Sequence, residues 1–370
     1  MRILYGVVGE GMGHATRSKV VCEELVRQGH EVMIVVSGRA HAYLARAFEN
    51  VVEIRGLELR YEDNRMALDQ TVATNVLAAP GMLHANLVAY EDRVAAFRPD
   101  AVITDFDSFA GYVGRRLGVP VISIDNQQIL SRCKLPKSIT RSSRFDYQLT
   151  KAFVRAKLPS LDYAFITTFF EPPVRPKYAS ATMLVPPILR GSILEAKARA
   201  QVGAHVLVYQ TSASDTSLLP TLNALADERF VVYGLRRRAT VGNCELFDFD
   251  EAAFVEHLAT AKAVVANGGF TTLSEAVFLG KPVYSVPVQH QYEQELNGRY
   301  IEHLGYGVVR PTVEESALEE FLADGPRMRR RVALHQQDGN RILLDALTQL
   351  LERLERKRAR DIERGREALS

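Results

Sequence analysis

The sequence predicts an α/β protein in which two doubly wound, Rossmann-like sheets face one another across a central cleft. Short apolar and β-branched runs alternate with helical patterns along most of the chain, which is typical of parallel sheets covered by helices. The pair Pro186-Pro187 interrupts this alternation, and a second series follows it. At 370 residues the chain is also longer than one typical domain. We therefore expect two domains.

The first series predicts five strands, separated in part by helices near 15–28, 81–97 and 107–117. The expected strands are 3–8, 31–36, 51–54, 101–104 and 120–124. The second series predicts five more, at 205–209, 230–233, 244–247, 263–266 and 282–286. Ligands of such sheets bind beyond the carboxyl ends of the strands. The site is therefore expected between the two domains, which we bound at residues 1–187 and 188–340.

Residues 341–370 form a third segment with a long helical pattern. Leucines recur on one face from Leu343 to Leu354, and the last part mixes both signs of charge. We expect the apolar part to pack on the protein, and the charged end either to project into solvent or to pair with a second copy.

The composition argues against several classes of protein. A formal net charge of +2 and a pI near 8.4 are too balanced to indicate nucleic-acid binding. No apolar run reaches membrane-spanning length, and Met1-Arg2 leads directly into a strand-like run without the features of a secretory signal. Three widely spaced cysteines fit neither a disulfide framework nor a zinc cluster. The prediction is a cytoplasmic protein that binds no nucleic acid.

The stretch "GEGMGHATRS", residues 9–18, combines a glycine-rich turn with a histidine directly after the first strand. A turn that only holds phosphate needs glycines and backbone N–H groups, so Gly11 and Gly13 are candidate donor contacts, whereas His14 indicates proton transfer. As a dinucleotide-binding fingerprint the stretch is imperfect, because His14 replaces the third glycine. The second strand lacks a following acid for an NAD ribose, but Arg39 suits NADP, which leaves an oxidoreductase as an alternative.

A second stretch, residues 266–300, has the layout of a diphosphate site at the start of a helix. Gly268 and Gly269 follow a predicted strand, and a helix begins near Thr271, so free backbone N–H groups face the cleft. Glu275 lies one turn into this helix, where a carboxylate suits two ribose hydroxyls. Acid and amide side chains that suit sugar hydroxyls follow at Glu293, Gln294 and Asn297.

This second stretch resembles the donor-binding segment of inverting GT-B glycosyltransferases, a superfamily that includes UDP-glucuronosyltransferases and the lipid II transferase of peptidoglycan synthesis. In plant members the pattern is roughly H-x-G-W-N-S-x-x-E, then G-V-P, then P-x-x-x-D-Q-x-x-N. The matching positions here are Gly269, Phe270, Thr271, Thr272, Glu275, Glu293, Gln294 and Asn297. Asn267 replaces the leading histidine, and the loop after Pro287 is slightly longer. The resemblance implies a nucleotide-sugar donor, with UDP as the nucleotide.

The first domain resembles the same superfamily more weakly. Its G-x-G-H loop is similar to the loop with the catalytic histidine, and "VITDFDSFAGYVGRRLGVPVISID" to the segment with the aspartate that orients it. The resemblance implies that His14 is the base, that Asp105 is its partner, and that a C-terminal helix crosses back onto the first domain. Asp105-Phe106-Asp107 also matches the D-x-D of metal-dependent GT-A enzymes, which leaves a divalent metal as an alternative.

These assignments predict an inverting hexosyltransferase that needs no metal and no cofactor. A histidine takes the proton of the acceptor, and the helix N-terminus at 269–272 stabilises the leaving diphosphate. Many retaining GT-B enzymes resemble one another in having a glutamate at the position of Asn267, so inversion is favoured. A nucleotide-sugar hydrolase, a non-hydrolysing epimerase and a catalytically silent sugar-nucleotide sensor are the alternatives on the same fold.

The acceptor is expected on the first-domain side and stays open between a lipid-linked compound and a small molecule. Residues 131–160 carry eight Lys or Arg against one acid, Asp146. Such a stretch predicts either a peripheral contact with anionic lipid at the inner face of the membrane or an ordinary solvated surface.

Overall fold

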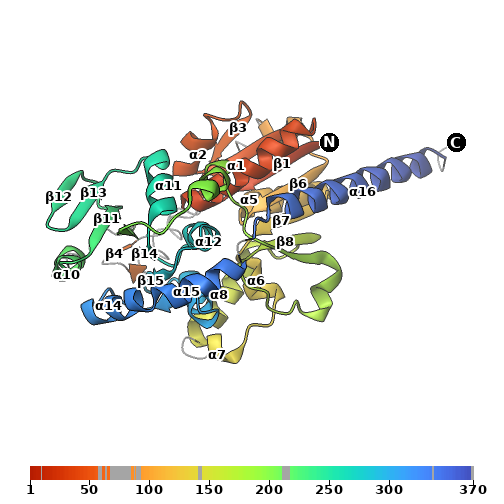
Figure 1. Cartoon of the computed structure of the whole chain (residues 1–370). Helices are drawn as coiled ribbons and strands as arrows, with labels where there is room; N and C mark the ends of the chain where they lie inside the picture. The colour runs from red at the N-terminus through yellow and green to blue at the C-terminus, as the bar shows by residue number, and fades with distance from the viewer. Residues whose placement is uncertain are drawn as a thin grey trace.

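The computed structural model describes residues 1–9, 11–56, 61–62, 65–66, 85–86, 88, 93–140, 144–210, 217–335 and 337–367. Within these ranges the chain forms two α/β halves, and a long C-terminal helix extends from the body (Figure 1). Most of the helix expected at 81–97 lies outside the described residues, apart from its end, α4 (Ala95–Phe97), and a few residues before it.

The first half is built on a seven-stranded parallel sheet with the order β3-β2-β1-β6-β7-β8-β9. Its strands are β1 (Arg2–Val7), β2 (Glu31–Ser37), β3 (Val51–Ile54), β6 (Ala101–Asp105), β7 (Val121–Asp125), β8 (Tyr163–Thr167) and β9 (Thr182–Val185). Every residue of β6 and β7 is buried, as expected for strands covered on both faces. The direction of strand succession reverses between β1 and β6, which opens a crevice at their carboxyl ends. A short hairpin, β4 (Tyr61–Glu62) with β5 (Arg65–Met66), forms a separate two-stranded sheet.

The helices of the first half connect these strands. They are α1 (Met12–Arg27), α2 (Arg39–Leu44), α5 (Ser108–Leu117), α6 (Gln128–Arg132), α7 (Lys137–Thr140), α8 (Arg144–Lys157) and the 3₁₀ helix η2 (Pro176–Ala181). Because α1 follows β1 and α5 follows β6, the N-termini of both helices face the crevice. The first turn of α1 therefore starts at the expected site.

The second half repeats the plan, with the strand order β12-β13-β11-β10-β14-β15-β16. Strand β12 pairs antiparallel with β13, and the other described pairs of this sheet are parallel. The strands are β10 (His205–Tyr209), β11 (Arg229–Tyr233), β12 (Ala239–Val241), β13 (Cys244–Phe247), β14 (Ala263–Ala266), β15 (Val283–Ser285) and β16 (Gly307–Val309). The helices are α9 (Gly191–Ala196), η3 (Lys197–Arg199), α10 (Leu218–Ala224), α11 (Glu251–Thr260), α12 (Phe270–Phe278), α13 (Tyr292–His303), α14 (Glu315–Ala323), α15 (Gly325–Val332) and η4 (Ala333–His335).

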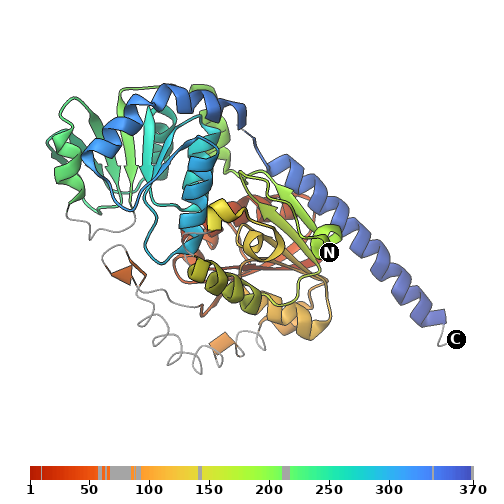
Figure 2. The same cartoon turned by 90° about the horizontal axis from the view of Figure 1, so that it is seen from below.

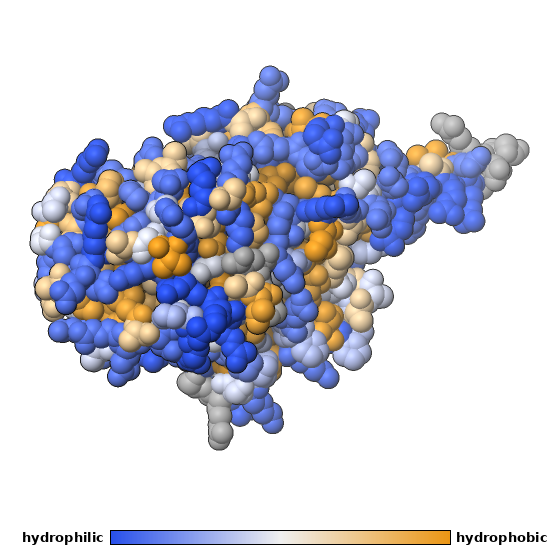
Figure 3. Space-filling model, in the orientation of Figure 1, coloured by the Kyte–Doolittle hydropathy of each residue, from blue (hydrophilic) through white to orange (hydrophobic). Residues whose placement is uncertain are grey.

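Two helices of the later sequence join the halves. The last helix, α16 (Asn340–Glu367), buries Leu343, Leu347, Leu350 and Leu351 in the core of the first sheet, so it crosses back as expected. Its far end projects from the body and is hydrophilic (Figures 2 and 3). Helix α13 packs its aromatic side chains against the first half, where Tyr300 stacks on Phe170. This contact sets the position of the polar first turn of α13.

The structure confirms the predicted fold class, two doubly wound sheets with a C-terminal helix that returns to the first. All ten predicted strands are present, with ends shifted by at most two residues. The prediction missed β4, β5, β8, β9, β12 and β16, of which all but β8 are at most four residues long. The residues at which the two domains were bounded stay a prediction. Among the described residues, no helix is long and apolar enough to cross a membrane.

Candidate active site

His14 lies in the first turn of α1, close to the carboxyl end of β1. Gly11 makes the preceding turn possible. It caps the helix with a backbone φ of 90°, which residues other than glycine rarely adopt. His14 is thus held on a helix rather than in a flexible turn, and its side chain is 14% exposed.

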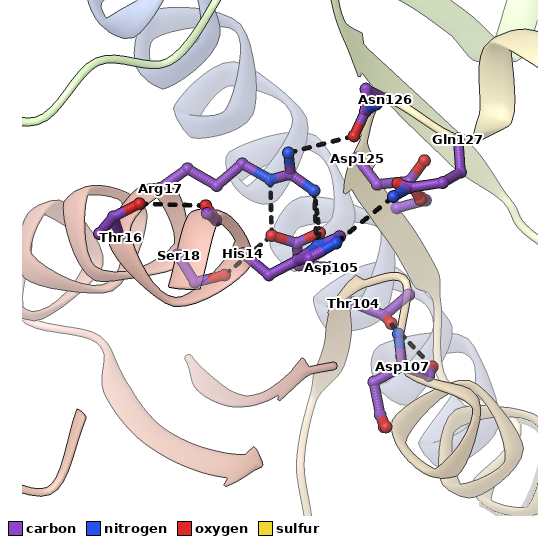
Figure 4. Close-up of polar contacts among 12 residues, drawn as sticks. His14, Thr16, Arg17, Ser18, Thr104, Asp105, Asp107, Asp125, Asn126 and Gln127 are labelled. Carbon is purple, nitrogen blue, oxygen red and sulfur yellow. Dashed lines mark hydrogen bonds and ion pairs between the residues drawn. The ribbon is translucent and has the colours of Figure 1, made fainter. Parts of the chain in front are cut away.

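Asp105, the last residue of β6, accepts a hydrogen bond from the His14 ring: Nδ1 lies 2.8 Å from Oδ1 (Figure 4). The same carboxylate is held by Arg17, whose Nη2 lies 2.6 Å from Oδ1 and whose Nε lies 2.7 Å from Oδ2. Burial raises the pKa of Asp105, but the charges of Arg17 and His14 and their hydrogen bonds outweigh it and lower that pKa to about 2. Asp105 is therefore a permanent carboxylate at neutral pH.

A line of amide side chains connects this cluster to the second half. Asn126 accepts from Arg17 Nη1 at 3.1 Å and donates to Glu293 Oε1 at 2.8 Å, while Gln127 donates to Glu293 Oε2 at 3.0 Å. Glu293 lies in the first turn of α13, so both of its carboxylate oxygens are occupied by the other half of the protein. The polar network of the site spans the two halves.

Gln127 also contacts the His14 ring. Its Nε2, which must be a donor because it bonds Glu293, lies 3.4 Å from His14 Nε2. Nδ1 faces both the Asp105 carboxylate and Arg17 Nη2, the latter at 2.7 Å, so the hydrogen bonds of the ring depend on its tautomer. In the tautomer that carries its proton on Nδ1, the ring donates to Asp105 and keeps a lone pair on Nε2. The lone pair on Nε2 is then directed at the boundary between the halves, where an acceptor hydroxyl would have to approach.

The start of α12 lies directly opposite the start of α1. A Cβ atom placed on Gly13 would lie 2.4 Å from Thr271 Oγ1, so the two helix N-termini are in contact through this glycine. Gly269 caps α12, and a Cβ there would meet nothing within 4 Å. Thr271 and Thr272 are half-buried, and Phe270 is buried against Phe169 with ring centroids 5.8 Å apart. The two sequence motifs predicted to form one site are adjacent in space.

The remaining amides of the second motif bond to the protein itself. Asn267 donates to the carbonyl of Val286 at 2.9 Å, and Asn297 to that of Gly268 at 3.0 Å. Gln294 accepts from the backbone N–H of Val288 at 2.9 Å. A Cβ on Gly268 would lie 2.2 Å from the carbonyl oxygen of Gln294, so only glycine allows α13 to approach this closely. These residues hold α12 and α13 together at the site.

Glu275 is buried in α12 and forms an ion pair that the sequence analysis did not anticipate. Both of its oxygens accept from Arg190, Nε at 2.8 Å and Nη2 at 2.9 Å. Arg190 lies in the segment between the two halves and also contacts Glu251 at 3.0 Å. Burial raises the pKa of Glu275, and Arg190 opposes that rise. Each carboxylate oxygen has a second lone pair, so ribose hydroxyls remain possible partners of Glu275.

The two carboxylates of Asp105-Phe106-Asp107 serve different purposes. Asp107 caps α5 by accepting from the backbone N–H of Ala110 at 2.8 Å, and its side chain points away from Asp105 (Figure 4). Burial raises the pKa of Asp107 to about 6. In the described part of the chain, no group of three or more His, Cys, Asp or Glu side chains is arranged to hold a metal ion.

A narrow pocket lies between the halves beside this network. Its walls include Asn126, Gln127, Phe270, Glu293 and Asn297. The Oε1 atom of Gln127 is buried and has no hydrogen-bond partner. An unpaired buried carbonyl oxygen is costly, and a hydroxyl in the pocket would satisfy it.

Comparison with known proteins decides the family. The sequence model of glycosyl transferase family 1 matches residues 1–326. The chain belongs to this family. This glycosyltransferase is 22% identical over 333 residues to an uncharacterised glycosyltransferase of Methanosarcina acetivorans, a match that covers 83% of this chain and 85% of the relative. A shorter match, 39% identical over 62 residues, is to a glycosyltransferase of Methanopyrus kandleri. The family removes the oxidoreductase alternative.

Solved structures agree on the fold. The calicheamicin glycosyltransferase CalG4 superposes with a TM-score of 0.64 at 19% identity, covering 95% of this chain and 99% of that one. MurG of Acinetobacter baumannii gives a TM-score of 0.58 at 14% identity, with coverages of 94% and 99%. At these identities the likeness establishes the GT-B fold of this glycosyltransferase and leaves its substrates open.

Proposed function

We propose that this glycosyltransferase transfers a hexosyl group from a UDP-sugar to an acceptor hydroxyl, with inversion and without a metal. The observation that carries the proposal is the contact between the two helix starts. The histidine of α1, with its aspartate, lies beside the N-terminus of α12 that is expected to hold the diphosphate. This adjacency supports the proposal, because the proposed base and the proposed leaving-group site would meet at one point between the halves.

The proposed reaction is a single displacement. His14 Nε2 takes the proton of the acceptor hydroxyl, and the hydroxyl oxygen attacks the anomeric carbon of the donor. The bond from that carbon to the diphosphate oxygen breaks, and the negative charge leaves on UDP. Backbone N–H groups and the positive end of the α12 dipole stabilise this charge. Asp105 holds Nδ1–H, orients the ring and stabilises the imidazolium that forms.

The donor contacts are assigned to residues on both sides of the boundary. Around the diphosphate we place Gly11, Gly13, Asn267, Gly268, Gly269, Phe270, Thr271 and Thr272. Glu275, fixed in one orientation by Arg190, is proposed to accept from the ribose hydroxyls. Glu293, Gln294 and Asn297 are proposed to face the sugar. Because Asn126 and Gln127 already donate hydrogen bonds to the Glu293 carboxylate, a bound sugar would replace those hydrogen bonds.

The acceptor is proposed to enter from the first half as a lipid-linked compound or a small molecule, and the reaction to take place in the cytoplasm. The compartment is supported by the cysteines: Cys22, Cys133 and Cys244 are all buried and free.

His14→Ala tests the role of the base. We expect turnover to fall by roughly 10²- to 10⁴-fold, as is usual when a general base is lost. Donor affinity, measured by calorimetry, should change by less than about threefold, because His14 does not hold the donor. Near-normal transfer by His14→Ala would refute the assignment. Asp105→Asn should lower turnover in the same direction.

Two product measurements test the rest. The anomeric configuration of the product, read by NMR, should be inverted relative to the donor, and retention would refute the single displacement. Release of nucleotide in the absence of any acceptor, at the rate seen with one, would indicate a nucleotide-sugar hydrolase or epimerase instead. We expect turnover to survive extensive treatment with a chelator. Loss of turnover after this treatment would indicate that the reaction needs a metal.

A further inference from the structure

Helix α8 (Arg144–Lys157) carries a second apolar face that is directed at solvent. Phe145 is 78% exposed, Leu149 49% and Phe153 45%, which is unusual for side chains of this size. They follow one another at intervals of four residues and therefore lie in one row along the helix. Ala152 and Ala156, both exposed, lie on the same side. We call these five residues the α8 face.

The opposite side of α8 already forms its core contacts. Tyr147, Val154 and the following Leu158 are buried in a cluster shared with α6 and α13. Tyr147 lies against Tyr292 of α13 with ring centroids 5.7 Å apart. Within the α8 face, Phe153 also lies edge-on to Phe106 with ring centroids 6.3 Å apart, whereas Phe145 and Leu149 are directed at solvent among the described residues. In Figure 2 the helix lies on the viewer's side of the molecule.

Positive charge borders the α8 face. On the helix itself, Arg144 and Arg155 lie along one border and Lys157 near the other, against a single acid, Asp146. Three cations of the helix thus flank the apolar row.

We propose that the α8 face is a docking surface for an anionic lipid bilayer, in which the apolar row enters the boundary between headgroups and acyl chains and the bordering cations contact lipid phosphates. This is the arrangement of helices that lie in a membrane interface, with apolar side chains on one face and Lys or Arg beside them. Pairing with a second copy through the same face would bring its own cations against like charges. The proposal does not depend on the assigned chemistry.

The location of α8 has a consequence for the enzyme. Since Tyr147 contacts α13 and α13 carries Glu293, the helix with the docking surface packs against a helix of the candidate active site. A bilayer on the α8 face would lie close to the first-half side of the site.

The test is sedimentation of the full chain with vesicles of phosphatidylcholine alone or with added phosphatidylglycerol. We expect binding to the anionic vesicles only. It should weaken when ionic strength rises from about 0.1 M to about 1 M, which shortens the screening length from about 10 Å to about 3 Å. The double variant Phe145→Ser/Leu149→Ser should bind about tenfold more weakly or worse, because it removes the apolar insertion.

Val202→Ser is the matched control, since Val202 is 57% exposed in the second half and should bind as the parent does. Thermal midpoints of both variants should equal that of the parent. Equal binding to neutral and anionic vesicles would overturn the proposal. Salt-sensitive binding that the double variant retains would also overturn it, leaving a merely basic surface. Self-association by light scattering that the double variant abolishes would assign the α8 face to a second copy.

Discussion

Replacing Glu275 with alanine should destabilise the second half of this glycosyltransferase and weaken donor binding at once. The two effects have different causes. The first comes from the ion pair with Arg190, and the second from the proposed hydrogen bonds to ribose. A matched variant separates them, because Glu251 pairs with the same arginine at 3.0 Å but has no proposed role toward the donor.

The magnitudes follow from burial. Glu275 is 3% exposed and holds Arg190, 13% exposed, through two hydrogen bonds. Removing one partner of a buried pair costs about 3–5 kcal/mol, because the other charge stays buried. Arg190 keeps Glu251, so the lower end of that range, about 3 kcal/mol, is expected for Glu275→Ala. Glu251 is 43% exposed, and its pair is screened by water, so Glu251→Ala should cost about 1 kcal/mol or less.

Thermal unfolding and calorimetry with UDP measure the two effects. For a unit of this size 1 kcal/mol corresponds to about 2–4 °C, so Glu275→Ala should lower the midpoint by about 6 °C or more and Glu251→Ala by less than about 4 °C. UDP affinity should fall about 10- to 150-fold in Glu275→Ala alone, from about 1.5–3 kcal/mol of lost charge-assisted hydrogen bonds. Equal midpoints for the two variants would refute the burial argument. Unchanged UDP affinity would refute the ribose assignment.

Three further results are expected. Gly13→Ala must push α1 from α12, because its Cβ would meet Thr271 Oγ1 at 2.4 Å, so turnover should fall about tenfold or more. Adding Thr271→Ala to the same chain should restore part of the turnover. If the second substitution restores none, the contact is contradicted. Asp107→Asn keeps the cap of α5 but removes a carboxyl whose pKa burial raises to about 6. The folded parent binds this proton more tightly than the unfolded chain, so the free energy of unfolding of the parent should fall as pH rises from about 4 to about 6. In urea titrations the variant should lose about 1–3 kcal/mol less of that free energy over the same window. An equal pH dependence of parent and variant would contradict the prediction. Glu293→Gln should lower kcat/KM about tenfold with UDP affinity within about threefold, and a large loss of UDP affinity would place Glu293 at the nucleotide instead.

The sequence was informative wherever a local pattern determines structure. All ten predicted strands were present because buried parallel strands are short apolar runs, and periodicity is sufficient to find them. Strands β9, β12 and β16 were missed because they lie at the edges of their sheets, where few of their residues are buried. The adjacency of His14 with Asp105 was implied by family resemblance, and parallel pairing of β1 with β6 accounts for it, since Val7 is in register with Asp105.

The missed residues of the site share another property. Arg17, Asn126, Gln127 and Arg190 matter through contacts with residues about 85 or more positions away in the chain. No local pattern records such contacts. A signal was nevertheless present for two of them: Asn126 and Gln127 directly follow a predicted strand, the location where ligand-binding side chains of a parallel sheet gather. Arg17 lies one turn after His14, within the stretch 9–18 that had been singled out.

The Glu293 contacts bear on how the donor site is used. In the structure both Glu293 oxygens accept from amides of the first half, and the pocket beside them is narrow. In the proposed donor assignment a hexose would occupy that space, and donor binding would exchange two protein hydrogen bonds for bonds to sugar hydroxyls. Such an exchange is nearly neutral in energy when every group stays paired. Gln127 would then be free to turn, and His14 Nε2 would lose the donor that faces it. Donor binding would therefore prepare the histidine to receive the acceptor, which orders the two substrates without any separate switch.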